Sequence, residues 1–354
     1  MKNIGILGGS RFIGYHLAHG LLKLGHRVTL FNRGLSVPPA PFPPSVNYVF
    51  GDRNKPSDVI NFLADPYDVV FDLSGYTVSH VQPLLTRDCL TKIRHYIFCS
   101  SSSVYKIPPP YTYTEEAPRS LRPNTYGGDK ALIENLLLGE CRTTGWPVTI
   151  LRPQGVFGPF DPARQARFVF SRLKNSLPIL LGSRQEYKIN FLYVTDLITI
   201  FTVLMNNSVA YGKTYNVAGD DTVDQQQFAT LCSEVSALPA QIRIVDDTRY
   251  RHLAIGIPWL DYHLVPDNSK IKHDLRHDFI PLKVALAATW EWLQTSPEDL
   301  IPRSFEGEEY LRENRPIPFI LDTYWRLNHM AKSSRIRQRV VSPIIRSVKR
   351  RFTL

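Results

Sequence analysis

Hydrophobic residues from position 4 to position 99 follow two alternating patterns. Short apolar runs at 4–7, 28–31, 46–50, 67–73 and 96–99 predict buried strands. Between the first two runs, apolar residues recur at helical spacing and the pattern ends at Gly25, which predicts a helix. Strands that alternate with helices indicate a doubly wound α/β fold with a parallel sheet and helices on both faces.

The second half of the chain continues this alternation less regularly. A strand is expected at 148–151 and helices at 196–206, 225–236 and 282–294. The apolar pattern weakens past about residue 303, where the charge also changes sign. We therefore predict a first domain at 1–160 joined by about 188–218, a smaller lobe at 161–302, and a C-terminal extension at 303–354.

The net charge of +10 is concentrated at the C-terminus. Residues 323–354 hold nine Lys and Arg and no acid, which leaves 33 basic and 32 acidic residues in the remainder of the 354-residue chain. Ser342-Pro343 starts a possible amphipathic helix with Ile344, Ile345, Val348 and Phe352 on one side and basic residues on the other. Contact with an anionic membrane and a solvated tail are equally open, and RNA is the weakest alternative because no aromatic stacking platform accompanies the charge.

Composition excludes several classes of protein. Cys89, Cys99, Cys141 and Cys232 are far apart and form no CxxC pair, which favours buried thiols in a reducing, cytoplasmic compartment. The first residues enter a glycine-rich turn too early for a secretory signal, and no apolar run reaches the roughly 18 residues of a membrane span. His273 and His277 are four residues apart without an obvious third ligand, so no metal site is predicted.

A nucleotide site is predicted where the first strand meets the first helix. Gly8 and Gly14 flank a turn in which the backbone can approach a pyrophosphate beside a helix N-terminus. The second strand ends in Asn32-Arg33 without the acid that binds the ribose of NAD, and an arginine fork suits a 2′-phosphate. NADP is therefore favoured over NAD, unless Arg33 and Arg11 are solvated surface residues.

Candidate catalytic residues follow the fifth strand. Ser100–Ser103 comes directly after it, and Tyr126 and Lys130 are four residues apart, on one face of a helix. A Tyr-x-x-x-Lys pattern alone occurs by chance about 0.7 times in a chain of this composition, so it needs its context. The order of glycine turn, serine strand and Tyr-Lys helix supplies that context.

These segments resemble the extended short-chain dehydrogenase/reductase family, the NAD(P)-dependent epimerase/dehydratase group. The resemblance runs from residue 4 to about 293 and implies a Rossmann-type fold. It is carried in order by LGGSRFIG (7–14), GDR (51–53), SSSSVY (100–105), YGGDK (126–130), LRPQGVFGP (151–159), NFLYVTD (190–196), TYNVAG (214–219), DNSKIKHDL (267–275) and ATWEWL (288–293).

The resemblance implies a role for each matching residue. Tyr126 would be the general acid/base, Lys130 its partner and a ligand of the cofactor ribose, and Ser101 the group that holds the substrate oxygen. A lysine ammonium and a positive nicotinamide both lower the pKa of a phenol. Substrate contacts are expected from Ser103, Arg184 and Asn190. The cofactor contacts are expected from Gly8, Ser10, Arg11, Phe12, Ile13, Gly14, Asn32, Arg33, Asp52, Leu73, Ser74, Gly75, Lys130 and Pro153.

Departures from the family pattern narrow the function. The serine segment lacks the acidic pair of 4,6-dehydratases, so an epimerase or ketoreductase acting on a nucleotide-sugar-like hydroxyl or keto substrate is expected. Arg11 replaces a glycine of the usual loop, as in a divergent branch that includes chloroplast stem-loop RNA-binding proteins. The alternative is therefore a catalytically silent binding protein on RNA or a membrane. Nucleic acid is an unlikely partner for a chain that keeps Tyr126 and Lys130, and a homodimer is possible.

Overall fold

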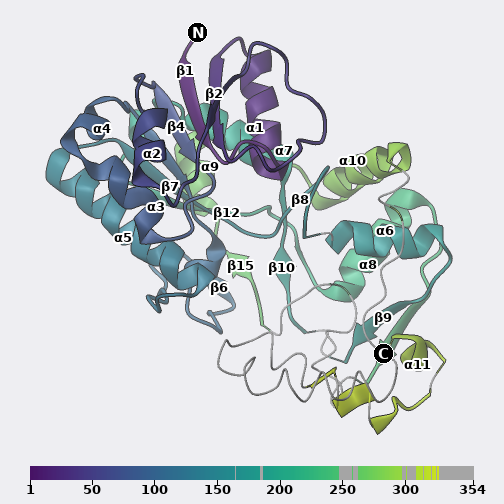
Figure 1. Cartoon of the computed structure of the whole chain (residues 1–354). Helices are drawn as coiled ribbons and strands as arrows, with labels where there is room; N and C mark the ends of the chain where they lie inside the picture. The colour runs from purple at the N-terminus through teal and green to yellow at the C-terminus, as the bar shows by residue number, and fades with distance from the viewer. Residues whose placement is uncertain are drawn as a thin grey trace. The chain divides into compact units, whose positions relative to one another are not determined.

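The protein is described by a computed structural model (Figure 1). The described residues are 1–163, 165–183, 186–246, 257, 262–296, 300, 308–313, 315–319, 321–323 and 325–326. The chain divides into two compact units. The first holds 1–163, 188–223 and 262–289, and the second holds 164–187, 224–261 and 290–354.

A seven-stranded parallel sheet forms the centre of the first unit. Its strands lie in the order β12-β7-β5-β4-β1-β2-β3, so the sheet grows outward from β1 in both directions. This order confirms the predicted doubly wound, Rossmann-type architecture, in which ligands bind where the order reverses. The strands are β1 (Asn3–Leu7), β2 (Arg27–Asn32), β3 (Asn47–Phe50), β4 (Val69–Asp72), β5 (Tyr96–Cys99), β7 (Val148–Pro153) and β12 (Thr214–Val217).

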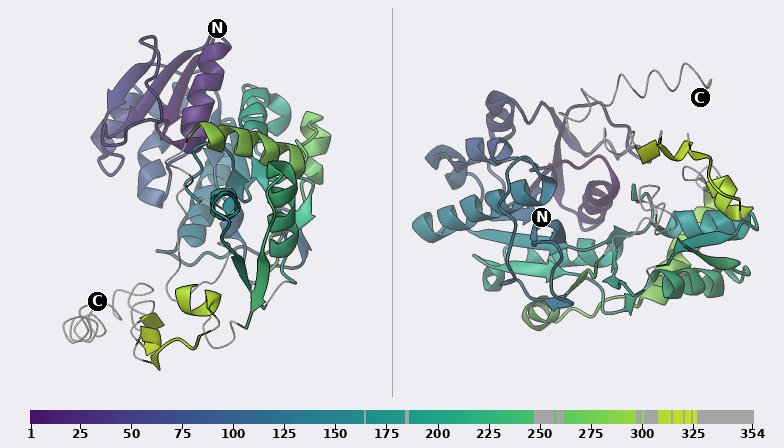
Figure 2. Two further views of the ribbon diagram at one scale, coloured as in Figure 1. Left: turned by 90° about the vertical axis from the view of Figure 1, so that its right-hand side faces the viewer. Right: turned by 90° about the horizontal axis from the view of Figure 1, so that it is seen from below.

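Helices cover both faces of the sheet (Figures 1 and 2). On one face α1 (Phe12–Lys23), α7 (Val194–Leu204) and α9 (Ser269–Leu275) share one apolar core. On the other face α2 (Pro56–Phe62), α4 (Arg87–Thr91) and α5 (Tyr126–Thr144) share a second core. The helical spacing seen in the sequence places Leu17 and Leu21 of α1 in the first core because residues four apart lie on one helix face.

Shorter elements complete the first unit. The short helices are α3 (Val78–Val81), η1 (Gln82–Leu85), η2 (Ser102–Val104) and η3 (Ser208–Ala210). Three two-stranded sheets pair β6 (Thr112–Tyr113) with β15 (Val265–Pro266), β8 (Val156–Phe157) with β11 (Leu192–Tyr193), and β10 (Ile189–Asn190) with β13 (Thr222–Val223). Helix α10 (Leu282–Thr295) runs across the division between the units.

The second unit has its own buried ion pair. Its elements are α6 (Gln165–Lys174), β9 (Ile179–Gly182), α8 (Gln225–Ser236), β14 (Ile242–Val245) and α11 (Glu308–Arg312), with β9 and β14 paired in parallel. Arg172 of α6 donates through both terminal nitrogens to Glu308 at 2.6 Å. Since each group is buried, the two-point geometry compensates the loss of hydration.

Several predicted boundaries shift in the structure. The strand expected at 67–73 is limited to Val69–Asp72, and the strand expected to stop at residue 151 continues through Pro153. The predicted tail helix after Ser342 lies outside the described residues. Within the described ranges, no helix is both long and apolar enough to cross a membrane.

Candidate active site

A cavity of about 620 Å³ lies at the carboxyl ends of the strands around β1. This is the crevice where a doubly wound sheet binds its ligand. Among the residues predicted to hold the cofactor, the lining includes Gly8, Ser10, Arg11, Phe12, Ile13, Gly14, Asn32, Arg33, Asp52, Leu73 and Ser74. The sequence did not assign Phe31, Leu35, Ser36, Gly51, Arg53, Asn54, Tyr76, His80, Cys99 and Pro162, which complete it.

The glycine turn is shaped by two close backbone approaches. Gly8 has a φ of +99°, and a Cβ there would lie 2.9 Å from the Cβ of Ser74. A Cβ on Gly14 would lie 2.3 Å from the carbonyl oxygen of Gly8. Because glycine has no Cβ at either position, the first turn of α1 can lie close to the carboxyl end of β1. The turn thus brings the helix N-terminus to the cavity, as pyrophosphate binding requires.

Arginine side chains at the cavity rim are available for a ligand. Arg11 precedes α1 and makes no capping bond to it. Asn32 accepts a 2.8 Å hydrogen bond from the backbone N–H of Gly34, which fixes the end of β2. Arg33 is exposed and, in the part of the chain that the structure describes, its guanidinium has no hydrogen-bond partner. Hydrogen bonds from Asn54 hold the pKa of Asp52 below its usual range, so this rim residue is a carboxylate at neutral pH.

A buried ion pair supports the wall of the cavity beside β4. Arg53 binds Asp72 through both terminal nitrogens and donates to Ser74 Oγ at 3.0 Å. Asp72 also accepts from the N–H groups of Ser74 and Gly75 at 3.0 and 2.8 Å, and from the Tyr96 hydroxyl. Burial is the largest influence on Asp72 and raises its pKa, but the charge and hydrogen bonds of Arg53, the Tyr96 hydroxyl and the charge of Lys130 together hold the pKa below its usual value. Gly75, which donates its N–H to Asp72, supports the cavity wall and is not among the residues that line the cavity.

The serine turn and helix α5 meet through a glycine. A Cβ on Gly127 would lie 1.8 Å from the carbonyl oxygen of Ser103, so only glycine lets the first turn of α5 approach η2 this closely. Ser101 precedes η2, and its Oγ accepts from the Ser103 N–H at 3.1 Å and donates to Ser103 Oγ at 3.1 Å. The Ser101 side chain lies close enough to Tyr126 to lower the pKa of the phenol, against the larger effect of burial. The structure thus brings Ser101, Ser103 and Tyr126 together.

Lys130 is buried behind Tyr126 rather than bound to it. Its Nζ donates to the Cys99 carbonyl oxygen at 2.7 Å and lies 6.0 Å from the centre of the Tyr126 ring. Burial raises the pKa of Tyr126 to about 12, although the Ser101 side chain opposes the change. The sequence predicted a lowered phenol pKa. That prediction concerned a phenol beside a positive nicotinamide as well as the lysine, whereas burial is the main cause of the raised pKa in the structure and the Cys99 thiol adds to it.

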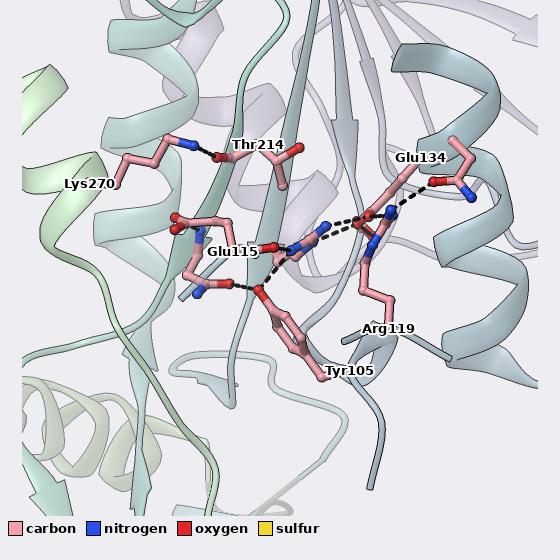
Figure 3. A network of polar contacts seen from close by, with 10 residues as sticks. Tyr105, Glu115, Arg119, Glu134, Thr214 and Lys270 are labelled. Carbon is pink, nitrogen blue, oxygen red and sulfur yellow. Dashed lines mark hydrogen bonds and ion pairs between the residues drawn. The ribbon is translucent and has the colours of Figure 1, made fainter. Parts of the chain in front are cut away.

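A polar network behind the serine turn fixes α5 to the sheet (Figure 3). Glu134 of α5 binds Arg152 of β7 with two hydrogen bonds, accepts from Arg119 at 2.7 Å, and accepts from Ser100 Oγ at 2.6 Å. Arg152 also donates to the Tyr105 hydroxyl at 2.8 Å. Because Tyr126, Lys130 and Glu134 are each four residues apart, one face of α5 contacts the end of β5 at consecutive turns.

Two predicted contact residues are buried and are not among the residues that line the cavity, and a third is not described. Pro153 is buried in β7, opposite Val217, and does not line the cavity. Asn190 is buried in β10, where its Nδ2 donates to the Pro266 carbonyl oxygen at 3.3 Å and its Oδ1 has no partner among the residues that the structure describes. Arg184 lies outside the described residues. A residue predicted from a segment's resemblance can therefore serve packing in the protein itself.

Comparison with known proteins identifies the family. Residues 4–218 match the model of the NAD dependent epimerase/dehydratase family. The chain belongs to this family. The match confirms the family that the motifs indicated and the prediction of an enzyme of the NAD(P)-dependent epimerase/oxidoreductase type.

Two curated relatives and one solved structure illustrate the range of similar proteins. The chain is 30% identical to the chloroplast stem-loop binding protein of 41 kDa b of Arabidopsis thaliana over 77% of this chain and 74% of that protein. It is 27% identical to a UDP-N-acetyl-alpha-D-glucosaminuronate decarboxylase of Bacillus cytotoxicus over 83% of this chain and 98% of the relative. A UDP-glucose 4-epimerase of Thermotoga maritima, solved with UDP-glucose, has a TM-score of 0.69 at 17% identity and covers 83% of this chain and 99% of its own. That structural likeness shows the fold.

Proposed function

We propose that the protein is an NAD(P)-dependent epimerase or ketoreductase with Ser101, Tyr126 and Lys130 as its catalytic residues. The supporting geometry is the position of Tyr126 and Lys130 beside a cavity with a glycine cradle. Tyr76 and Cys99 line the cavity, the ring of Tyr76 lies 6.3 Å from that of Tyr126, and Lys130 binds the carbonyl group of Cys99.

The residues of the cavity fit a nicotinamide dinucleotide. The N-terminus of α1 and the turn at Gly8 would hold the pyrophosphate, Asp52 lies at the adenosine side, and Leu73 and Ser74 at the ribose side. Lys130 would leave the Cys99 carbonyl for the ribose hydroxyls. When bound, the dinucleotide supplies the hydride acceptor of the reaction.

Each catalytic side chain then has a separate task. Ser101 donates a hydrogen bond to the substrate oxygen and holds it near Tyr126. Tyr126 takes the proton from a substrate hydroxyl in oxidation and returns it to a keto oxygen in reduction. Lys130, once turned from Cys99, lowers the pKa of the phenol from its raised value because a positive charge favours the phenolate.

The substrate class follows from the family's nucleotide-sugar members. We propose a nucleotide sugar or a similar hydroxyl or keto compound, whose reacting oxygen is held at Ser101, Ser103 and Tyr126 of the first unit. NADP is the preferred cofactor because no acid ends β2 and because the Arg33 guanidinium has no hydrogen-bond partner among the described residues. We place the enzyme in the cytoplasm, since its four free cysteines suit a reducing compartment. Dimer formation and tail contact with membranes remain predictions.

One experiment tests the cofactor and the chemistry together. The nucleotide that co-purifies with the full chain is identified by mass spectrometry, and UDP-glucose is then added as the probe substrate with wild type and Tyr126→Phe. We expect NADP(H) or NAD(H) in both proteins and a change in the probe only with wild type. Turnover by Tyr126→Phe at the wild-type rate would contradict the assignment of the base.

A second function rests on one specific similarity. The 30% identical Arabidopsis relative is a stem-loop binding protein, so a binding protein without chemistry is the alternative. The two functions predict different results for the cofactor site. A wild-type chain that carries no nucleotide and shifts a stem-loop RNA in a gel would favour the alternative.

A further inference from the structure

Three aromatic rings enclose the ammonium group of Lys130. Its Nζ lies 4.6 Å from the ring centre of Phe98, 5.2 Å from that of Tyr76 and 6.0 Å from that of Tyr126. The residue is only 1% exposed. An ammonium has three donors, yet among the described residues Nζ has a hydrogen bond only to the Cys99 carbonyl oxygen. The ring faces therefore supply much of its remaining stabilisation.

Tyr76 is the wall of this enclosure on the cavity side. Phe98 is fully buried in β5, whereas Tyr76 is 49% exposed and lines the cavity. A ligand that enters the cavity therefore meets the Tyr76 ring before it meets Lys130. Removal of this ring alone would open Lys130 to water without a change in the core.

The loop that carries Tyr76 is anchored through its backbone. The Tyr76 N–H donates to His80 Nδ1 at 3.3 Å, and the Gly75 N–H donates to Asp72 Oδ1 at 2.8 Å. A Cβ on Gly75 would lie 2.8 Å from Phe98, so the loop lies directly against β5. Since neither anchor uses the Tyr76 side chain, the position of the ring is set by the fold and the side chain can be exchanged.

We propose that Tyr76 is a positioning residue whose ring covers Lys130 and keeps water from the ammonium until a ligand enters. This role rests on the proposed function of Lys130, and it adds a residue that the Ser-Tyr-Lys pattern does not contain. Covering Lys130 requires the aromatic ring of Tyr76 and not its hydroxyl group. Tyr76→Phe should therefore behave as wild type, and Tyr76→Ala should not.

The electrostatic surroundings of Lys130 predict the direction of the effect. Burial lowers its pKa, the Cys99 thiol and Asp72 raise it, Arg53 lowers it and Glu134 raises it, and the phenols of Tyr76 and Tyr126 face it as neutral groups. Burial is the largest of these causes. Water admitted by Tyr76→Ala should thus raise the pKa of Lys130 toward that of an exposed lysine.

Amine labelling of the full chain tests the cover without any substrate. Trinitrobenzenesulfonate reacts with neutral lysines, and peptide mass mapping gives the labelling rate of Lys130 at each pH, with the exposed Lys106 and Lys174 as internal references. In Tyr76→Ala the plateau rate of Lys130 should rise about ten-fold, because an enclosed amine reacts only when its enclosure opens. The pH midpoint of Lys130 labelling should rise toward that of the exposed reference lysines. Tyr76→Phe should match wild type in both.

Other outcomes of the same labelling experiment would contradict the proposal. Equal Lys130 labelling in wild type and Tyr76→Ala, or a Tyr76→Phe variant that labels like Tyr76→Ala, would overturn the cover. Should Tyr76→Ala not fold, as judged by circular dichroism, Tyr76→Val is expected to give the same increase in labelling. Saturating NADP+ should protect Lys130 in wild type. Absence of protection by NADP+ and by NAD+ would count against the proposed function alone, since the contrast between the variants does not depend on a cofactor.

Discussion

Glu134 and Arg152 form a buried ion pair with two hydrogen bonds, from Nε to Oε1 at 2.9 Å and from Nη2 to Oε2 at 2.7 Å. The pair joins α5, which carries Tyr126 and Lys130, to β7, which lies between β12 and β5 in the sheet. Because Glu134 also accepts from Ser100, the residue before Ser101, the pair fixes the serine turn relative to the helix. The arrangement of the proposed catalytic residues thus depends on charged groups that are not among the residues lining the cavity.

Loss of this pair should cost much stability. Glu134→Gln keeps the size of the side chain but leaves Arg152 buried without its counter-charge. We expect the free energy of unfolding to fall by about 3–5 kcal/mol, as for other broken buried pairs. Urea unfolding followed by circular dichroism measures the change.

An exposed pair provides the control. Arg94 lies 3.3 Å from Asp68 and its side chain is 78% exposed. Arg94→Gln should change the free energy of unfolding by less than about 1 kcal/mol, because water screens such pairs. Similar losses in the two variants would show that the network around Glu134 is not held together by its charges.

The sequence predicts those parts of the site whose signal is local. Gly8 and Gly14 stand six residues apart in one turn, and Tyr126 and Lys130 one helical turn apart, so each pair could be recognised without knowledge of the fold. The order of the strands and helices also follows from local periodicity. Most of the predicted glycine-turn residues accordingly line the cavity.

The rest of the candidate site depends on contacts between residues that are far apart in the sequence. Arg53 meets Asp72 across 19 residues, and neither its burial nor its partner can be read from the motif GDR. Tyr76 has no motif at all, because its position over Lys130 results from the packing of the loop after β4 on β5. Pro153, which the resemblance places at the cofactor, is buried in β7 opposite Val217 and is not among the residues that line the cavity.

Two glycines of α5 should respond oppositely to alanine. Gly127→Ala would place a Cβ 1.8 Å from the Ser103 carbonyl oxygen, so the serine turn and the helix must separate. We expect a destabilised protein and loss of turnover, measured as the unfolding midpoint and the rate with the probe substrate. A Gly127→Ala variant with both values unchanged would disprove the close approach of α5 to η2.

Gly139 is the matched position in the same helix. The nearest atom to a Cβ there is a terminal nitrogen of Arg142 at 4.0 Å, so alanine meets no obstacle. Gly139→Ala should stabilise the protein by about 0.5–1 kcal/mol, because alanine has less backbone freedom to lose than glycine. The two variants together separate steric contact from helix propensity.

Cofactor choice should depend on the end of β2. Arg33→Ser removes an exposed guanidinium from the cavity rim and should weaken NADPH binding about ten- to hundred-fold, the value of one or two charge-assisted hydrogen bonds. NADH binding should change little, since NADH lacks the 2′-phosphate. Fluorescence titration with both cofactors measures the two dissociation constants.

A substitution at the neighbouring residue tests the same preference in a second way. Asn32→Asp places a carboxylate at the end of β2, where it accepts from ribose hydroxyls and repels a 2′-phosphate. We expect the preference to move toward NADH. A ratio of NADPH to NADH affinity that stays the same in both variants would place the 2′-phosphate elsewhere in the cavity.

His95 is held neutral inside the first unit. Its Nδ1 accepts from the Asn206 N–H at 3.2 Å, so Nε2 carries the proton and donates to Thr149 Oγ1 at 2.9 Å. Thr149 in turn donates to the Ala210 carbonyl oxygen at 2.8 Å. Burial lowers the pKa of His95 from 6.5 to about 4. A second proton on Nδ1 would point at the N–H of Asn206, so this hydrogen bond disfavours the protonated imidazole in the folded protein.

This lowered pKa predicts a loss of stability in acid. The folded protein binds the proton less readily than the unfolded chain does, so His95 gives its full contribution above pH 6.5 and loses it as the pH falls toward about 4. The difference corresponds to about 3 kcal/mol. Urea unfolding at neutral pH and near pH 4 should show a smaller decrease for His95→Asn than for wild type. His273→Asn, at an 89% exposed side chain, should keep the wild-type decrease. An acid loss as large in His95→Asn as in wild type would assign the effect to other groups.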